Sequence, residues 1–202
     1  MITKKTASII SFCLATLVAF LPFNYIIGSR LACFSYSSMA IPALGSQYSL
    51  LYVILYFLTK GLFAFSFPYL FVFRRLPLFF AAIALKNKNI MTSIMIPVTA
   101  MTLFCMHPVG GQAFYYSFYW IVPMVIYFIK QDSICSRALS ASFVAHAIGS
   151  IVWLYTGSIP VEAWTVLMPI VIVERVIFAA GMVGFTYLFK CIDSFVQSKV
   201  TA

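Results

Sequence analysis

Four long apolar runs separated by short connections restrict this chain to very few folds. They lie in the second half of the sequence, and each approaches or exceeds the roughly 20 residues that a helix needs to cross a bilayer. The runs cover residues 90–106, 114–129, 138–155 and 164–189. Hydrophobic residues form 63% of the 202-residue chain and charged residues 8%, which is more apolar surface than a soluble fold of this size can bury. We therefore expect an all-α, polytopic membrane protein with a single integral membrane domain over residues 1–202.

Lysine and arginine occur in every second connection of the back half, which orients the predicted helices. The connections 107–113 and 157–163 carry no cation. By the positive-inside rule these two connections face outward, and the cation-bearing ones face the cytoplasm. The cations are Lys86, Lys88, Lys130, Arg137, Lys190 and Lys199, and Lys4 and Lys5 add two more at the N-terminus. Both termini are therefore expected on the cytoplasmic side of the plasma membrane.

The front half of the chain is less regular. Residues 7–27 form the first predicted span, since they are too long for a signal core and lack a small-residue cleavage site. Residues 41–58 form the second span, which returns to Lys60 in the cytoplasm. The apolar segment 61–85 is interrupted by Arg74-Arg75, and two guanidiniums at mid-bilayer carry a high free-energy cost. We expect a broken interfacial or re-entrant segment there, which gives about six transmembrane helices; a crossing would give seven.

Charge distribution and missing motifs exclude several classes of function. The net charge of +9 is scattered over the ends of apolar runs rather than gathered in a stripe, which argues against nucleic-acid binding. The chain contains no G-x-x-x-x-G-K-[ST], H-E-x-x-H or G-x-S-x-G pattern, so no ATPase, metalloprotease or hydrolase motif is present. The cysteines show no metal-ligand spacing. We expect no enzyme activity, no catalytic residue, and no metal or cofactor.

Three ionisable side chains fall inside predicted spans, where burial of charge usually indicates function: His146, Glu174 and Arg175. The alternative is structural, with Glu174 paired to His146 or Arg175 bonded to a neighbouring helix. Helical spacing places Ser142, His146, Gly149, Ser150 and Trp153 on one face. Such a face lines a pocket open to the outside or packs against another helix.

The stretch "MHPVGGQAFYYSFYW", residues 106–120, combines a polar turn with an aromatic cluster in an outward-facing connection. Its glycines permit close backbone approach, and its rings offer stacking surface to a planar small molecule. The aromatic residues are Tyr115, Tyr116, Tyr119 and Trp120. We expect them to line the upper wall of a ligand site; the alternative is an aromatic belt at the membrane surface.

Small residues at strict four-residue spacing follow one face of the first span: Ser11, Ala15 and Ala19. Such a stripe permits close helix packing, either within one chain or against another.

These features resemble the substrate-binding membrane subunit, or S component, of energy-coupling factor vitamin transporters. The size, the six-span layout and the small-residue stripe match, and "CFSYSSMAIPALGSQYSLLY", residues 33–52, is similar to the family's loop-then-helix segment. The resemblance implies capture of a micronutrient from outside, with a transmembrane coupling subunit and ATPase subunits as separate partner chains. It implies ligand contacts at Tyr115, Tyr116, Tyr119, Trp120, His146, Trp153 and Glu174, and partner contacts at Ser11, Ala15 and Ala19.

Two other classes of function stay open. The first is a small integral membrane enzyme that uses His146 and Glu174, with His107 placed too near the outer surface to share one metal with them. The second is a non-catalytic membrane assembly protein, for which small-residue stripes suffice. In each case membrane lipid is the surrounding medium.

Overall fold

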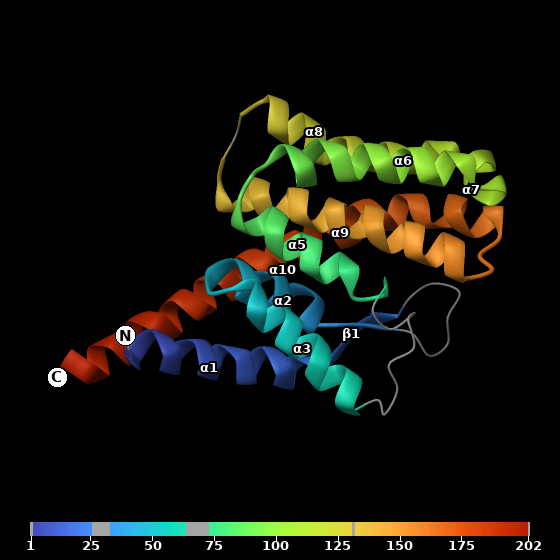
Figure 1. Cartoon of the computed structure of the whole chain (residues 1–202). Helices are drawn as coiled ribbons and strands as arrows, with labels where there is room; N and C mark the ends of the chain where they lie inside the picture. The colour runs from blue at the N-terminus through green and yellow to red at the C-terminus, as the bar shows by residue number, and fades with distance from the viewer. Residues whose placement is uncertain (1, 26–32, 64–72, 131, 202) are drawn as a thin grey trace.

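The chain folds into a bundle of helices that pass back and forth between two ends, as the computed structural model shows for residues 2–25, 33–63, 73–130 and 132–201 (Figure 1). The first half contains α1 (Ile2–Leu17) with the turn η1 (Val18–Phe20), then α2 (Ser37–Gln47), α3 (Leu50–Phe63) and α5 (Leu76–Lys86). The second half contains η2 (Met91–Met95), α6 (Ile96–Met106), α7 (Pro108–Gln112), η3 (Phe114–Trp120), α8 (Ile121–Phe128), α9 (Ile134–Thr156) and α10 (Val161–Thr201).

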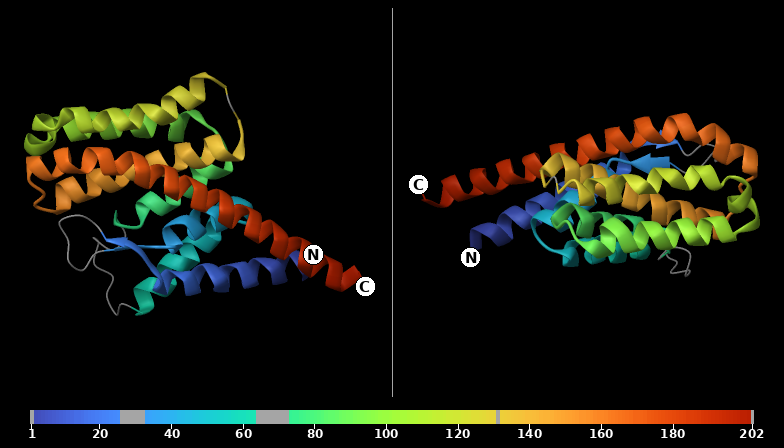
Figure 2. Two further views of the ribbon diagram at one scale, coloured as in Figure 1. Left: turned by 180° about the vertical axis from the view of Figure 1, so that it is seen from behind. Right: turned by 90° about the horizontal axis from the view of Figure 1, so that it is seen from above.

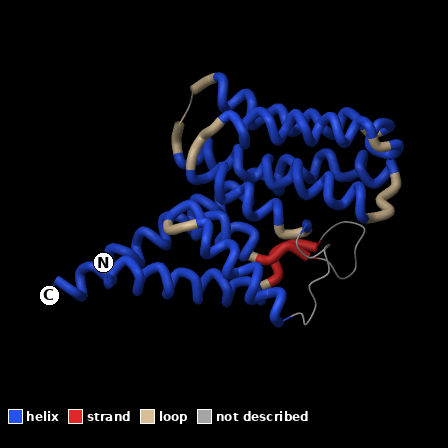
Figure 3. The backbone as a smooth tube through the Cα atoms, viewed as in Figure 1, coloured by secondary structure: helices blue, strands red, loops and turns tan. Residues whose placement is uncertain are grey.

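One small β element accompanies the helices. Strands β1 (Pro22–Tyr25) and β2 (Cys33–Ser35) pair antiparallel as a ribbon (Figure 3). The ribbon lies at the same end of the bundle as α7 and the α9–α10 connection, which we call the ribbon end (Figure 1). Both chain termini lie at the opposite end, together with the α5–α6 and α8–α9 connections, and we call this the terminal end (Figures 1 and 2).

Among the described residues, two helices are long and apolar enough to cross a membrane, Ile134–Thr156 and Val161–Val200. Shorter apolar helices accompany them at Leu50–Gly61, Leu76–Lys86, Met91–Met106 and Phe114–Phe128. Much of the outer surface of α10 is apolar and exposed, for example Ile172, Val173 and Val176. Exposed aliphatic side chains along one helix face are costly in water and favourable against lipid chains.

The predicted second span, residues 41–58, is not one helix. The polar run Ser46–Ser49 ends α2 and α3 begins at Leu50, so the chain turns back within this segment. Gly45 permits the tight packing that follows, because a Cβ at this position would lie 2.5 Å from Val53 Cγ2 and 2.9 Å from Ala82 Cβ. The two short helices together occupy the sequence assigned to a single crossing.

This turn moves Lys60 to the ribbon end. The Lys60 Nζ lies 4.5 Å from the centroid of the Phe20 ring, at the far end of α1 from Lys4 and Lys5. The prediction that Lys60 shares the side of the N-terminus is therefore wrong.

The segment 61–85 is broken, as predicted, but its second half is not peripheral. Helix α3 ends at Phe63, residues 64–72 lie outside the described part of the chain, and α5 begins at Leu76. Helix α5 packs between α2 and α9, and its buried residues are Ala81, Ala82, Ala84 and Leu85. Its small side chains let three helices approach closely, so α5 belongs to the core of the bundle rather than to an interfacial segment.

The small-residue stripe of α1 packs inside the chain. Ser11 and Ala15 are fully buried, and Ala19 is half-buried against the same core. The hydroxyls of Ser11 and Tyr48 lie 3.0 Å apart and share a hydrogen bond. The prediction that Ser11 and Ala15 contact a separate partner chain is therefore wrong in this arrangement, because other parts of the same chain already cover them.

Candidate ligand-binding cavity

A cavity of about 470 Å³ opens at the ribbon end, between the starts of α2 and α5 and the facing sides of α9 and α10. Two hydrophobic clusters meet around it: the first includes Phe178 and Met182, and the second includes Tyr116 and Trp164. A volume of this size suits a small-molecule ligand. The aromatic side chains in the cavity wall are Phe34, Tyr116, Trp153, Trp164 and Phe178.

Helix α9 supplies a continuous strip of the cavity wall. The five residues predicted to share one helix face, Ser142, His146, Gly149, Ser150 and Trp153, all line the cavity, which confirms the shared face. Gly149 leaves space in the wall, because an added Cβ would meet only Pro77 Cγ, at 3.7 Å. Ser142 also donates a hydrogen bond to the backbone oxygen of Arg175, 2.9 Å away, which ties α9 to α10.

Two adjacent arginines, Arg74 and Arg75, line the cavity from the segment just before α5. The Arg74 guanidinium carbon lies 4.8 Å from the centroid of the Trp153 ring, so the guanidinium is held over the aromatic face. In the sequence the pair predicts a break in the segment 61–85, and a place in a ligand site does not follow from it. The signal in the sequence that could have located them is the high free energy of two cations inside an apolar segment. A polar cavity lowers that free energy.

Glu174 and Arg175 line the opposite wall, on α10. Their side chains form an ion pair with 3.3 Å between Arg175 Nη2 and Glu174 Oε2. Arg175 is 5% exposed, its guanidinium lies 4.5 Å from the centroid of Phe178, and its Nε has no hydrogen-bond partner within the described residues. His146 Nε2 is likewise buried without a hydrogen-bond partner among the described residues.

The stretch 106–120 contributes only Tyr116 to the cavity wall. His107 instead caps α7, where its Nδ1 accepts a hydrogen bond from Val109 N at 3.2 Å. A Cβ on Gly110 would collide with the carbonyl oxygen of Phe104, so this glycine allows α7 to fold back against α6. The polar turn is therefore a helix cap and a close backbone contact.

The other three aromatic residues of this stretch hold the fold together, which corrects their prediction as cavity-lining residues. Tyr115 shares a hydrogen bond of 2.8 Å with Thr165, and the Tyr119 hydroxyl donates to Met168 O at 2.9 Å. Trp120 is fully buried. All three residues fasten η3 to neighbouring helices, and of the predicted ligand contacts Tyr116, His146, Trp153 and Glu174 come together in one cavity.

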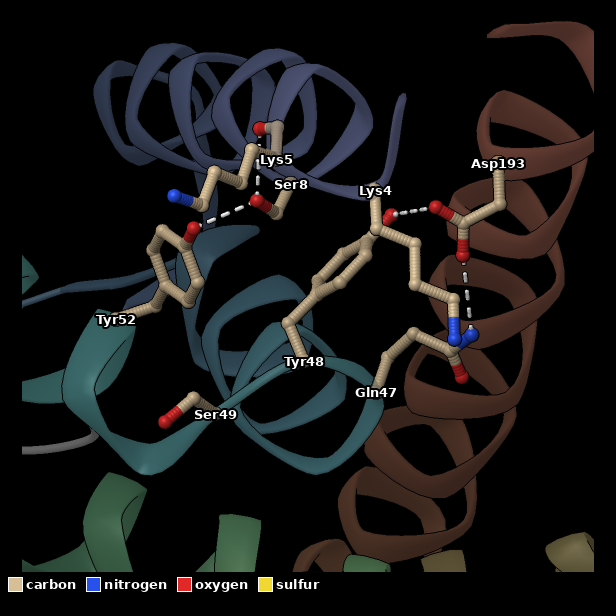
Figure 4. A pocket seen from close by; sticks show the side chains of 8 residues that line it. All are labelled: Lys4, Lys5, Ser8, Gln47, Tyr48, Ser49, Tyr52 and Asp193. Carbon is tan, nitrogen blue, oxygen red and sulfur yellow. Dashed lines mark hydrogen bonds between the residues drawn. The ribbon is translucent and has the colours of Figure 1, made fainter. Parts of the chain in front are cut away.

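A second, smaller pocket of about 320 Å³ lies at the terminal end (Figure 4). Asp193 on α10 accepts hydrogen bonds from the Tyr48 hydroxyl at 3.0 Å and from Gln47 Nε2 at 3.3 Å. Burial raises the pKa of Tyr48 to about 12, so its hydroxyl stays protonated even at a pH that would ionise an exposed tyrosine. Ser8 and Tyr52 share a further hydrogen bond of 2.6 Å. These bonds join α1, the α2–α3 turn and α10, which is a structural role.

Among the residues that the structure describes, no three His, Cys, Asp or Glu side chains group as a metal site. Comparison with known proteins gives no match to this chain, whether against family models, curated proteins or solved structures.

Proposed function

We propose that this chain is the substrate-binding subunit of a micronutrient uptake system in the plasma membrane. The observation that carries the proposal is the cavity between α9 and α10. It combines aromatic walls with charged groups inside a bundle whose long helices are apolar enough to span a membrane. Aromatic surface with a few convergent polar groups is the composition of a small-molecule site.

The distribution of cations supports an orientation with the cavity facing outward and both termini in the cytoplasm. Eight of the 13 lysines and arginines belong to segments at the terminal end: Lys4, Lys5, Lys86, Lys88, Lys130, Arg137, Lys190 and Lys199. Cytoplasmic loops carry the excess of such residues in membrane proteins. The cavity then receives its ligand from outside.

Uptake against a gradient needs an energy source, and the chain contains no phosphate-binding loop. The proposal therefore includes a transmembrane coupling subunit and ATPase subunits as separate chains, as the resemblance to S components implies. ATP hydrolysis in those partners drives the bound subunit to release its ligand inward.

The test fills the cavity without disturbing the backbone. Gly149→Phe places a ring where the first added carbon has ordinary contact with Pro77 and the rest projects along the cavity wall. Gly184→Phe is the matched control, because an added Cβ there has no neighbour within 4 Å and the residue lies outside the cavity. Both variants replace a helical glycine with the same side chain.

The assay measures uptake of a panel of radiolabelled B vitamins in the native host after deletion of the gene. We expect deletion to abolish high-affinity uptake of one vitamin. The wild-type chain and Gly184→Phe should restore it, and Gly149→Phe should leave it at least about 10-fold lower at equal expression. Unchanged uptake of every vitamin in the deletion strain, or full restoration by Gly149→Phe, would contradict the proposal.

A further inference from the structure

The cavity carries an excess of positive charge. Its lining contains three arginines, Arg74, Arg75 and Arg175, and one acidic residue, Glu174. With neutral histidine the lining has a net charge of +2. Charges interact more strongly in a partly buried site than in bulk water, because less water screens them.

The arginines converge from two sides of the cavity. Arg74 and Arg75 precede α5, whereas Arg175 projects from the middle of α10. Ion pairing with Glu174 offsets one guanidinium, and the remaining excess has no acidic counterpart among the cavity-lining residues. The lining therefore favours an anion, which would interact attractively with the positive charge at both walls of the cavity.

Two of the guanidiniums lie over aromatic rings. Arg74 lies over Trp153, and Arg175 lies over Phe178 at 4.5 Å and Phe34 at 5.8 Å. A guanidinium carries five N–H donors, so contact with a ring still leaves donors for hydrogen bonds. Its fork of donors matches the paired oxygens of a carboxylate or a phosphate.

Aromatic surface adjoins the arginines in the same cavity. Trp164 and Tyr116 contact each other with ring centroids 4.9 Å apart, and Trp153 joins them from α9. A ligand that reaches from the arginines to these rings presents an anionic group at one end and a flat apolar body at the other.

We propose that the cavity selects a small aromatic molecule that carries a carboxylate or phosphate group, and that Arg74, Arg75 and Arg175 bind the anionic group. This inference rests on the proposed function, since it assigns the chemical class of the ligand that the uptake system captures. Trp153, Trp164 and Tyr116 then contact the aromatic body.

The experiment compares anionic ligands with neutral counterparts of the same shape. The purified full-length chain, in phosphatidylcholine nanodiscs, is titrated with nicotinate and nicotinamide, indole-3-acetate and its amide, and pyridoxal 5′-phosphate and pyridoxal. Calorimetry reports each Kd. We expect the anionic member of at least one pair to bind about 10-fold or more tightly than its neutral partner, since hydrogen bonds to charged groups are the stronger class.

Arginine variants locate the source of this selectivity. Arg74→Gln changes an exposed side chain and should fold normally, and Arg175→Gln probes the buried wall. Each should reduce the ratio of anionic to neutral affinity by about 10-fold. The ratio is insensitive to folding, because a loss of folded protein lowers the binding of both members equally. Arg137→Gln, outside the cavity and paired with Asp132, is the control and should keep the wild-type ratio.

Three results would overturn the inference. They are equal or tighter binding of every neutral member, no saturable binding of any anionic member, and unchanged ratios in the Arg74 and Arg175 variants. The inference also fails if the anion is a lipid headgroup. In that case phosphatidylglycerol in the nanodisc would raise the Tm of the wild type but not of Arg74→Gln, without any added ligand.

Uptake and selectivity separate the two proposals. If neutral vitamins bind in the cavity and uptake depends on the chain, the proposed function stands and the anion inference fails. If the anionic members bind but deletion of the gene changes no uptake, the anion inference stands and the proposed function fails.

Discussion

Replacement of Trp120 by alanine separates a packing role from a ligand-contact role. The side chain is fully buried, and its ring packs edge-on against Phe104 with 5.3 Å between centroids. The rings of Tyr116 and His146, which line the cavity, have their centroids 6.4 Å from that of Trp120. Trp120 therefore supports the cavity wall from behind and does not face a ligand.

The expected cost follows from the volume removed. Trp120→Ala deletes about 140 Å³. The lost transfer free energy of the side chain and the residual cavity, at about 24 cal/mol per Å³, together cost about 3–5 kcal/mol. For a chain of this size, each kcal/mol lowers the Tm by about 2–4 °C, so the expected decrease is about 6–20 °C. The indole Nε1 has no hydrogen-bond partner in the described structure, so loss of its N–H adds no further penalty.

The decrease is measured by heating the purified protein in one detergent and monitoring the loss of the folded peak by size-exclusion chromatography. Trp120→Phe is the control, since it keeps most of the ring and should cost about 1 kcal/mol. Trp153→Ala is the complementary variant, because Trp153 lines the cavity, and it should weaken ligand binding with a smaller loss of Tm. The reasoning fails if Trp120→Ala has the Tm of the wild type, or if it weakens binding by folded protein more than Trp153→Ala does.

Two further predictions concern packing and topology. Ala15→Leu should lower the Tm of the isolated chain by several degrees, because Ala15 is fully buried. An unchanged Tm would mean that Ala15 lies on the surface. In a background without native cysteines, Lys60→Cys and Gln112→Cys should react with an impermeant thiol reagent in intact cells, and Asn87→Cys should not. Equal reactivity of the Lys60 and Asn87 positions would mean that both lie on the cytoplasmic side, as the sequence predicts for Lys60.

The second half of the fold follows closely from the sequence. The predicted runs 138–155 and 164–189 correspond to α9 (Ile134–Thr156) and α10 (Val161–Thr201). The runs 90–106 and 114–129 correspond to η2 with α6 and to η3 with α8. Long apolar runs bounded by polar connections leave little choice of secondary structure, because a chain in lipid must satisfy its backbone hydrogen bonds internally.

The front half illustrates where hydropathy alone fails. Residues 41–58 average as one apolar run, yet the four residues Ser46–Ser49 suffice to end a helix and reverse the chain. The cost assigned to Arg74 and Arg75 assumed contact with lipid. Long-range packing of α5 against α9 places these arginines at a cavity instead, and no local pattern contains that information.

The aromatic stretch was misassigned from the sequence alone. Residues 114–120 form a 3₁₀-helix with about three residues per turn, and Tyr115 and Tyr119 both use their hydroxyls to bind α10, at Thr165 and at Met168 O. Tyr116, Ser117 and Trp120 are buried, whereas Phe114 and Phe118 are exposed, and which side chains are buried depends on the packing of η3 against its neighbours. On α9, where the helix is regular, the same kind of reasoning located the cavity face correctly.

The most direct test of the account asks whether the cavity is open to the outside and positively charged. Gly149→Cys, in a chain whose five native cysteines are replaced, is treated in intact cells with two membrane-impermeant reagents. One is the anionic sulfonatoethyl methanethiosulfonate and the other its cationic trimethylammonioethyl counterpart. The account predicts that the Gly149 position is labelled from outside, and faster by the anionic reagent, with this preference reduced by Arg74→Gln. Labelling only after permeabilisation of the cells, or faster labelling by the cationic reagent, would contradict it.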